Sequence, residues 1–305
     1  MKLGKKDGGR YETDYTSLTK GIHVFFPAEF RNDSSLVVGY ASRWRKITTY
    51  DGETLISKKV IIDDRVRGHL LDSNNYLVIL PANSEENVKI MDSLVKAEYK
   101  VMESAKNLII DIRNNGGGTI RAYRSLIPFA YTNPIQQIGG NKLYSKLICD
   151  VEEKNLNEYE KENPSDTALI HLKNGWIQEY KMNMSKIEFD PGKLVRFDSI
   201  KRYPENVAII ANSGSMSAAE MMIYDYKQSK KVTVFGEHTY GGIDYLDNFY
   251  VDLPSMKYEA SISSKERKIL IGDKKRDYVG IFPDVVIPDS KTDWVKFVQD
   301  YYNKK

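Results

Sequence analysis

The chain has 305 residues, of which 41% are hydrophobic and 29% charged, and its formal net charge is +3. This length and composition are typical of one large globular domain with appendages or of two modest domains, and they exclude fibrous and disordered classes. Because basic and acidic residues nearly balance and form no dense basic stripe, we expect no nucleic-acid partner.

The N-terminal part of the sequence changes character after about twenty residues. Residues 1–20 are polar and rich in glycine, which indicates a loose leader without the apolar core of a signal peptide. Short apolar or alternating runs then predict strands, at 36–40, 60–62 and 76–80. We therefore expect a short β-rich N-terminal subdomain over residues 1–75. No stretch of the sequence reaches the roughly 20 apolar residues that span a bilayer.

The central region alternates helical and strand patterns. Residues 85–104 place apolar side chains three and four positions apart, which predicts an amphipathic helix. Wholly apolar runs predict buried strands, at 108–112, 207–211 and 232–235, and helical patterns follow the first two, at about 120–129 and 217–228. This alternation favours an α/β core over residues 76–290, with a largely parallel sheet covered on both faces.

Two stretches lie outside this pattern. The segment at about 145–203 is charged and loosely patterned, so we expect a peripheral excursion, and residues 291–305 are expected to form a C-terminal helix.

The single cysteine, Cys149, lies in an apolar run and is expected to be a buried hydrophobe. No Cys/His ligand spacing or His-Glu-x-x-His motif is present, so the sequence predicts neither a metal nor a cofactor.

Two strand-turn-helix units carry residues suited to chemistry. In the first, a strand enters three glycines at 116–118, whose backbone N–H groups can approach and bind an oxyanion. In the second, Ser217 lies at the start of a helix, where the dipole favours developing negative charge and the N–H of Ala218 has no intrahelical partner. Each unit alone also fits a plainer reading, a tight turn for the first and an ordinary helix cap for the second.

Four segments in order resemble the tail-specific or C-terminal processing proteases, the family that includes the tricorn core and interphotoreceptor retinoid-binding-protein-like repeats. They are Asp111–Gly118, Asn212–Glu220, Gly236–Gly242 and Gly280–Val285. The resemblance implies a crotonase/ClpP-like α/β core and a serine peptidase that acts on peptides or unfolded proteins. It implies Ser217 as nucleophile, an oxyanion hole at Ala218 with Gly117 or Gly118, and a periplasmic or extracytoplasmic location.

The base that activates the serine is less plainly marked. Many members of the family use a lysine at the position of Gly242, so the resemblance is to the tricorn-like branch, which uses a histidine and a distant acid. His23 precedes a short apolar strand, as the family's upstream histidine does, and is our candidate base. His238 is a second candidate, and His69 and His171 are expected at the surface.

The candidate acid is Asp277, three residues before Gly280, where the tricorn-like branch places its acid. The plainer alternative for Asp277 is a solvated surface charge, and the plainer alternative for His23 is a histidine packed in the core.

Many relatives carry a PDZ domain before the glycine signature, but the roughly 50 residues between His23 and Tyr76 are too few for one. The sequence thus predicts an active Ser/His/Asp peptidase, with a catalytically inactive peptide- or ligand-binding protein as the alternative.

Overall fold

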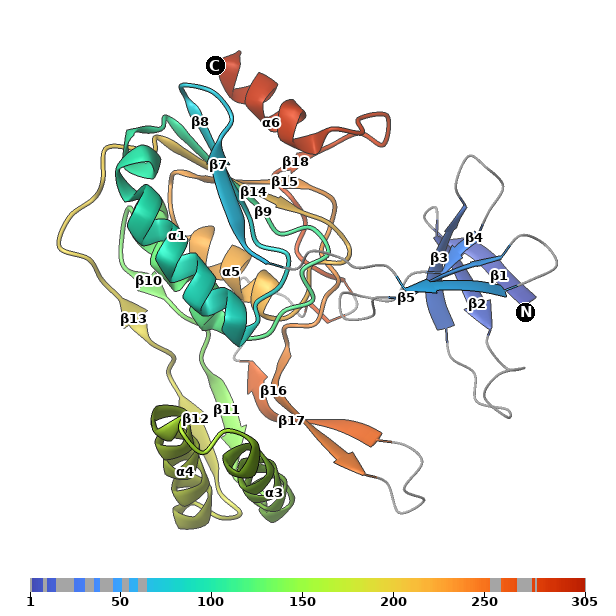
Figure 1. Ribbon diagram of the computed structural model, residues 1–305, viewed down its shortest axis with the longest axis vertical. Helices are drawn as coiled ribbons and strands as arrows, with labels where there is room; N and C mark the ends of the chain where they lie inside the picture. The colour runs from blue at the N-terminus through green and yellow to red at the C-terminus, as the bar shows by residue number, and fades with distance from the viewer. Residues whose placement is uncertain are drawn as a thin grey trace.

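The structure is a computed structural model of the chain (Figure 1). It describes the strand residues 2–7, 10–14, 25–30, 36–38, 46–50 and 55–59, and then residues 65–252, 259–267, 276–277 and 279–304. Helices and strands occur together in a mixed α/β fold, as the sequence predicts.

Six strands at the N-terminus form an antiparallel sheet in chain order. They are β1 (Lys2–Asp7), β2 (Arg10–Asp14), β3 (Phe25–Phe30), β4 (Leu36–Val38), β5 (Lys46–Tyr50) and β6 (Leu55–Lys59). The first two lie within the expected loose leader, so that prediction is wrong for these residues. Their register sets Lys2 opposite Asp14 and Asp7 opposite Arg10. Backbone groups make the hydrogen bonds of such a ladder, so it forms without the apolar periodicity on which the prediction relied.

A second six-stranded sheet forms the core of the molecule. Its order is β18 (Val285–Val286), β15 (Val232–Gly236), β14 (Asn206–Ala211), β9 (Asn107–Asp111), β8 (Asn75–Ile79) and β7 (Arg67–Leu70). All neighbours pair in parallel except β7 and β8. This confirms the predicted parallel sheet, and every residue of β9 is buried, as expected for a strand covered on both faces.

Helices cover both faces of this sheet (Figure 1). One face packs against α1 (Glu85–Ser104), the 3₁₀ helix η1 (Ile120–Leu126), α2 (Ile127–Ala130) and α5 (Ala218–Tyr226). The other packs against α6 (Trp294–Asn303). Successive residues of β9 alternate between the two, since Ile109 belongs to the α6 side and Ile110 to the α1 side. The period-two alternation of a strand therefore builds two hydrophobic cores from one apolar run.

The segment between these core elements folds into its own small structure. It contributes β10 (Ile135–Gln136), β11 (Gly140–Leu143), α3 (Lys146–Glu162), α4 (Thr167–Met182), β12 (Ile187–Asp190) and β13 (Leu194–Val195). With β16 (Tyr245–Asp252) and β17 (Glu259–Arg267) it forms a four-stranded sheet in the order β12-β11-β17-β16. Cys149 of α3 is buried between the two helices, as predicted. Among the described helices, none is long and apolar enough to cross a membrane.

Candidate active site

The two predicted units meet because their strands are neighbours. Strands β9 and β14 pair in parallel, with Asp111 opposite Ile210, so both chains leave the same edge of the sheet. The glycine turn follows β9 and the serine turn follows β14. At such a carboxyl edge, the loops after adjacent strands line a common crevice.

Hydrogen bonds lock the two turns to one another. The N–H of Met216 donates to the carbonyl of Asn115 at 2.9 Å, and the N–H of Asn114 donates to the side chain of Asn212 at 2.8 Å. The hydroxyl of Ser215, which is fully buried, donates to the carbonyl of Ile112 at 2.8 Å. The position of Ser217 is therefore fixed relative to the glycine turn.

Gly117 lies directly against Ser217. A Cβ added at Gly117 would stand 2.7 Å from the Cβ of Ser217 and 2.8 Å from the carbonyl oxygen of Met216, and the φ of Gly117 is +94°. Both the space and the backbone conformation therefore require glycine at this position. Ser217 is itself strained, with φ 55° and ψ −117°, values that a non-glycine residue adopts only when its surroundings impose them.

Two backbone N–H groups near Ser217 have no acceptor within the part of the chain that the structure describes. The N–H of Gly117 donates to Oδ1 of Asn115 at 3.0 Å, whereas those of Gly118 and Ala218 donate no hydrogen bond among the described residues. Asn115 is fully buried, and its Nδ2 donates to the carbonyl of Leu80 and to the side chain of Asn83. Of the two predicted glycines, Gly118 is the one whose N–H is available.

Glu220 joins the serine turn to the loop that follows β15. The carboxylate is fully buried and accepts four hydrogen bonds, from the N–H of Ser217, the hydroxyl of Thr239 and the N–H groups of Gly241 and Gly242. Burial raises the pKa of Glu220 from its ordinary value, and these four donors partly offset that effect. Sequence reasoning noted Glu220 only as part of a motif, because three of its four donors lie about twenty residues further along the chain.

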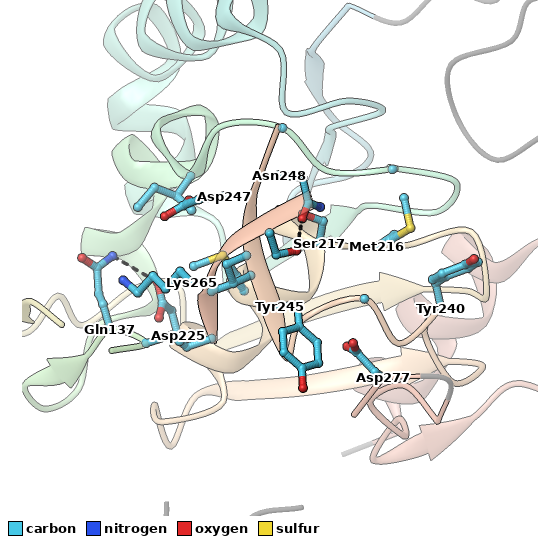
Figure 2. A pocket seen from close by; sticks show the side chains of 18 of the residues that line it. Gln137, Met216, Ser217, Asp225, Tyr240, Tyr245, Asp247, Asn248, Lys265 and Asp277 are labelled. Atoms are coloured by element: carbon cyan, nitrogen blue, oxygen red, sulfur yellow. Dashed lines mark hydrogen bonds between the residues drawn. The ribbon is translucent and has the colours of Figure 1, made fainter. Parts of the chain in front are cut away.

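Ser217 lines a cleft of about 1470 Å³, which Gly118, Gly242 and Asp277 also line. Figure 2 shows Ser217 between two ends of this cleft, with Tyr240 and Asp277 at one end and Gln137 and Asp225 at the other. Oδ1 of Asp277 accepts from the N–H groups of Ile243 and Asp244, at 3.0 and 2.8 Å. The structure thus brings the predicted nucleophile, acid and free glycine amide to one cleft.

Of the two candidate bases, His238 is exposed and does not line the cleft. His69 on β7 and His171 on α4 are exposed, as expected, and do not line the cleft either. Nδ1 of His238 lies 2.8 Å from the carbonyl oxygen of Thr239, and its ring faces Phe282. His23 lies outside the described residues.

Comparison with known proteins gives one family. The sequence model of peptidase family S41 matches residues 77–287. No curated protein matches the chain.

The chain is similar to several solved structures at low sequence identity. The chain is similar to a candidate peptidase from Parabacteroides merdae, with 17% identity over 80% of this chain and 65% of that one, and a TM-score of 0.49. It is also similar to a photosystem II D1 C-terminal processing protease, with 14% identity over 94% and 71% and a TM-score of 0.49. For the tricorn protease, the identity is 13% over 99% and 28%, and the TM-score is 0.41. The chain thus spans less than two thirds of the first and third of these proteins.

Proposed function

The chain belongs to peptidase family S41, and from that premise we propose that it is a serine-type endopeptidase acting on peptides or unfolded proteins. Ser217 is the nucleophile, on a core of the crotonase/ClpP-like type. The observation that carries the proposal is the contact between the strained Ser217 and the glycine turn, beside two N–H groups that have no acceptor among the described residues.

Each group has a role in peptide hydrolysis. The Oγ of Ser217 attacks the carbonyl carbon of the scissile bond while a base takes its proton. The N–H groups of Gly118 and Ala218 then donate to the oxygen that becomes negatively charged, and Gly117 keeps the turn close enough for them to converge. The base returns its proton to the leaving amine as the C–N bond breaks, and water hydrolyses the acyl-enzyme.

For the base we propose His23, oriented by Asp277. The supporting observations are that Asp277 lines the same cleft as Ser217 and that Gly242 occupies the place of a lysine base. The amides of Ile243 and Asp244 hold one carboxylate oxygen of Asp277, and Oδ2 accepts no hydrogen bond from the described residues. That oxygen is left to accept a hydrogen bond from an N–H of an imidazole.

One observation favours a second candidate function, a peptide-binding protein without catalysis. None of the three histidines among the described residues lines the cleft, and a serine without a base is a poor nucleophile at neutral pH. In that case the cleft binds an extended peptide and releases it intact.

The test of the first function is hydrolysis of casein or of a fluorogenic peptide by the purified chain and by its Ser217→Ala variant. We expect the variant to lose activity by a factor on the order of a million, because the nucleophile is removed, and to keep its fold by circular dichroism. Hydrolysis that persists in the variant contradicts the assignment of Ser217. Binding without hydrolysis by the unmodified chain supports the second function.

A further inference from the structure

One buried carboxylate in the cleft, that of Asp225, has no ion-pair partner among the described residues, and the exposed Arg124 acts on it only through space. Asp225 is 2% exposed, and both of its donors, the hydroxyl of Tyr123 at 3.1 Å and Nε2 of Gln137 at 3.2 Å, reach the same oxygen, Oδ2. Among the described residues, none donates a hydrogen bond to Oδ1 and no lysine or arginine forms an ion pair with Asp225. Burial raises the pKa of Asp225 to about 6. A cation placed beside a buried carboxylate without an ion-pair partner offsets the free-energy cost of burying its charge.

Asp225 lies on the same face of α5 as the nucleophile. Ser217, Met221 and Asp225 are four residues apart, which is the spacing of one helical face, and all three line the cleft. At the helical rise of about 1.5 Å per residue, Ser217 and Asp225 are about 12 Å apart along the axis. Only a long side chain on a substrate held at Ser217 can cross most of that distance.

The wall between these two residues is apolar. Ile138 and Leu246 are 8% and 6% exposed, belong to one hydrophobic cluster and contact Met221, and all three line the cleft. Lysine and arginine bury their methylene stems against such surfaces while the charged end seeks a polar partner. An apolar wall that ends at a carboxylate matches a long side chain with a cationic end.

The other charged groups of the cleft differ from Asp225. Nζ of Lys265 pairs with Asp190 at 2.6 Å, so both charges are compensated within the protein. Arg124 and Lys193 are exposed to solvent. Of the remaining carboxylates that line the cleft, Asp247 is exposed and Asp277 is half-buried. Among the described carboxylates of the cleft, Asp225 is therefore the one that combines burial with the lack of an ion-pair partner.

We propose that Asp225 is a specificity-determining residue, the end of a subsite for a lysine or arginine side chain of the substrate. This proposal rests on the peptidase function proposed above and adds to it a class of substrate, peptides with a basic residue close to the scissile bond. The stem of that residue lies along Met221, Ile138 and Leu246, and its ammonium or guanidinium group donates to Oδ1 of Asp225.

The test is a binding measurement, which needs no catalysis. Fluorescent peptides that differ at one position, occupied in turn by lysine, arginine, leucine or glutamate, are titrated into the full chain carrying Ser217→Ala. Fluorescence anisotropy gives each Kd. We expect lysine and arginine at one scanned position to bind on the order of tenfold more tightly than leucine, and glutamate to bind most weakly, because the pair forms in a site shielded from water.

The substitution Asp225→Asn in the same background keeps the side chain's size and removes its charge. We expect it to abolish the preference for lysine over leucine while the affinity for the leucine peptide stays the same. The matched control is Asp247→Asn, which removes an exposed charge from the same cleft and should leave the preference intact. Equal affinities for the lysine and leucine peptides at every position, or a preference that survives Asp225→Asn, overturn the proposal.

A second measurement is independent of whether Asp225→Asn folds. The groups acting on Asp225 are Arg124 and Tyr123 of η1 and Tyr226 of α5. Burial raises the pKa of both tyrosines well above their ordinary value and that of Asp225 to about 6, so of these three groups Asp225 is the one that changes charge near pH 6. The preference for lysine should fall as the pH falls through about 6, because the carboxylate becomes neutral. A preference that is constant between about pH 8 and about pH 5 contradicts the proposal.

These outcomes separate the subsite from the peptidase function. If the lysine preference depends on Asp225 but the unmodified chain hydrolyses no peptide, the subsite is supported and the peptidase function is contradicted. If the chain hydrolyses peptides at rates that do not depend on lysine or arginine, the peptidase function is supported and the subsite is contradicted.

Discussion

At the scale of single residues, the contact between Gly117 and Ser217 is the most sensitive point of the site. An alanine Cβ at Gly117 would come within 2.7 Å of the Cβ of Ser217, a separation that real Cβ atoms essentially never show. We expect Gly117→Ala to lower peptide hydrolysis by a factor on the order of a hundred or more, because small displacements of a nucleophile are costly. We also expect it to lower the free energy of unfolding by about 1–3 kcal/mol, because φ is positive.

Gly175 provides the matched control for this substitution. It lies in α4, and a Cβ added there meets nothing within 4 Å. Gly175→Ala should raise the free energy of unfolding by roughly 0.5–1 kcal/mol, since alanine favours helices, and leave hydrolysis unchanged. Chemical denaturation and a peptidase assay measure both variants. Full activity in Gly117→Ala would show that the glycine turn does not shape the site.

His23 is the residue whose proposed role has the clearest pH signature. A histidine base is active when neutral, and an ordinary imidazole loses its proton near about 6.5. Activity should therefore rise with pH through about 6 to 7, and His23→Ala should abolish it. The substrate for this profile should lack lysine and arginine, so that the charge of Asp225 does not contribute. A profile that rises only above about pH 9 would indicate a lysine base instead.

At the scale of elements, apolar periodicity predicted most of the core. The helix expected at 85–104 is α1, Glu85–Ser104, and the apolar runs at 108–112, 207–211 and 232–235 correspond to β9, β14 and β15. These elements are buried along one stripe or on both faces, so apolar residues recur in their sequences at the spacing of a helix or strand. Helices α3 and α4 escaped prediction because most of their surface is exposed, and few positions show the apolar stripe.

The site was predicted only in part, for a physical reason. Local sequence indicated that Ser217 begins a helix and that three glycines follow a strand. The hydrogen bonds that Glu220 accepts from the loop at 239–242 depend on strand pairing, which no local pattern encodes. Asp225 carried one local signal, its place four and eight residues after Met221 and Ser217 on a helix. That spacing identifies a shared face but does not reveal that the face lines a cleft.

At the scale of the whole molecule, the sheet, the serine turn and the four-stranded extension meet around one cleft. The core sheet supplies the two turns, and β16 and β17 supply part of the opposite wall, including Leu246 and Lys265. The chain matches family S41 over residues 77–287, and every residue that lines the cleft lies within that region. We propose that this cleft contains an activated serine.

Covalent labelling tests that claim most directly. A fluorophosphonate reacts with a serine only when a base and an oxyanion hole activate it. The full chain, incubated with the probe near neutral pH and analysed by intact mass and peptide mapping, should gain one adduct, located on Ser217. The adduct should be absent from the Ser217→Ala variant. A chain that folds and stays unlabelled, or that carries the adduct on another serine, contradicts the account.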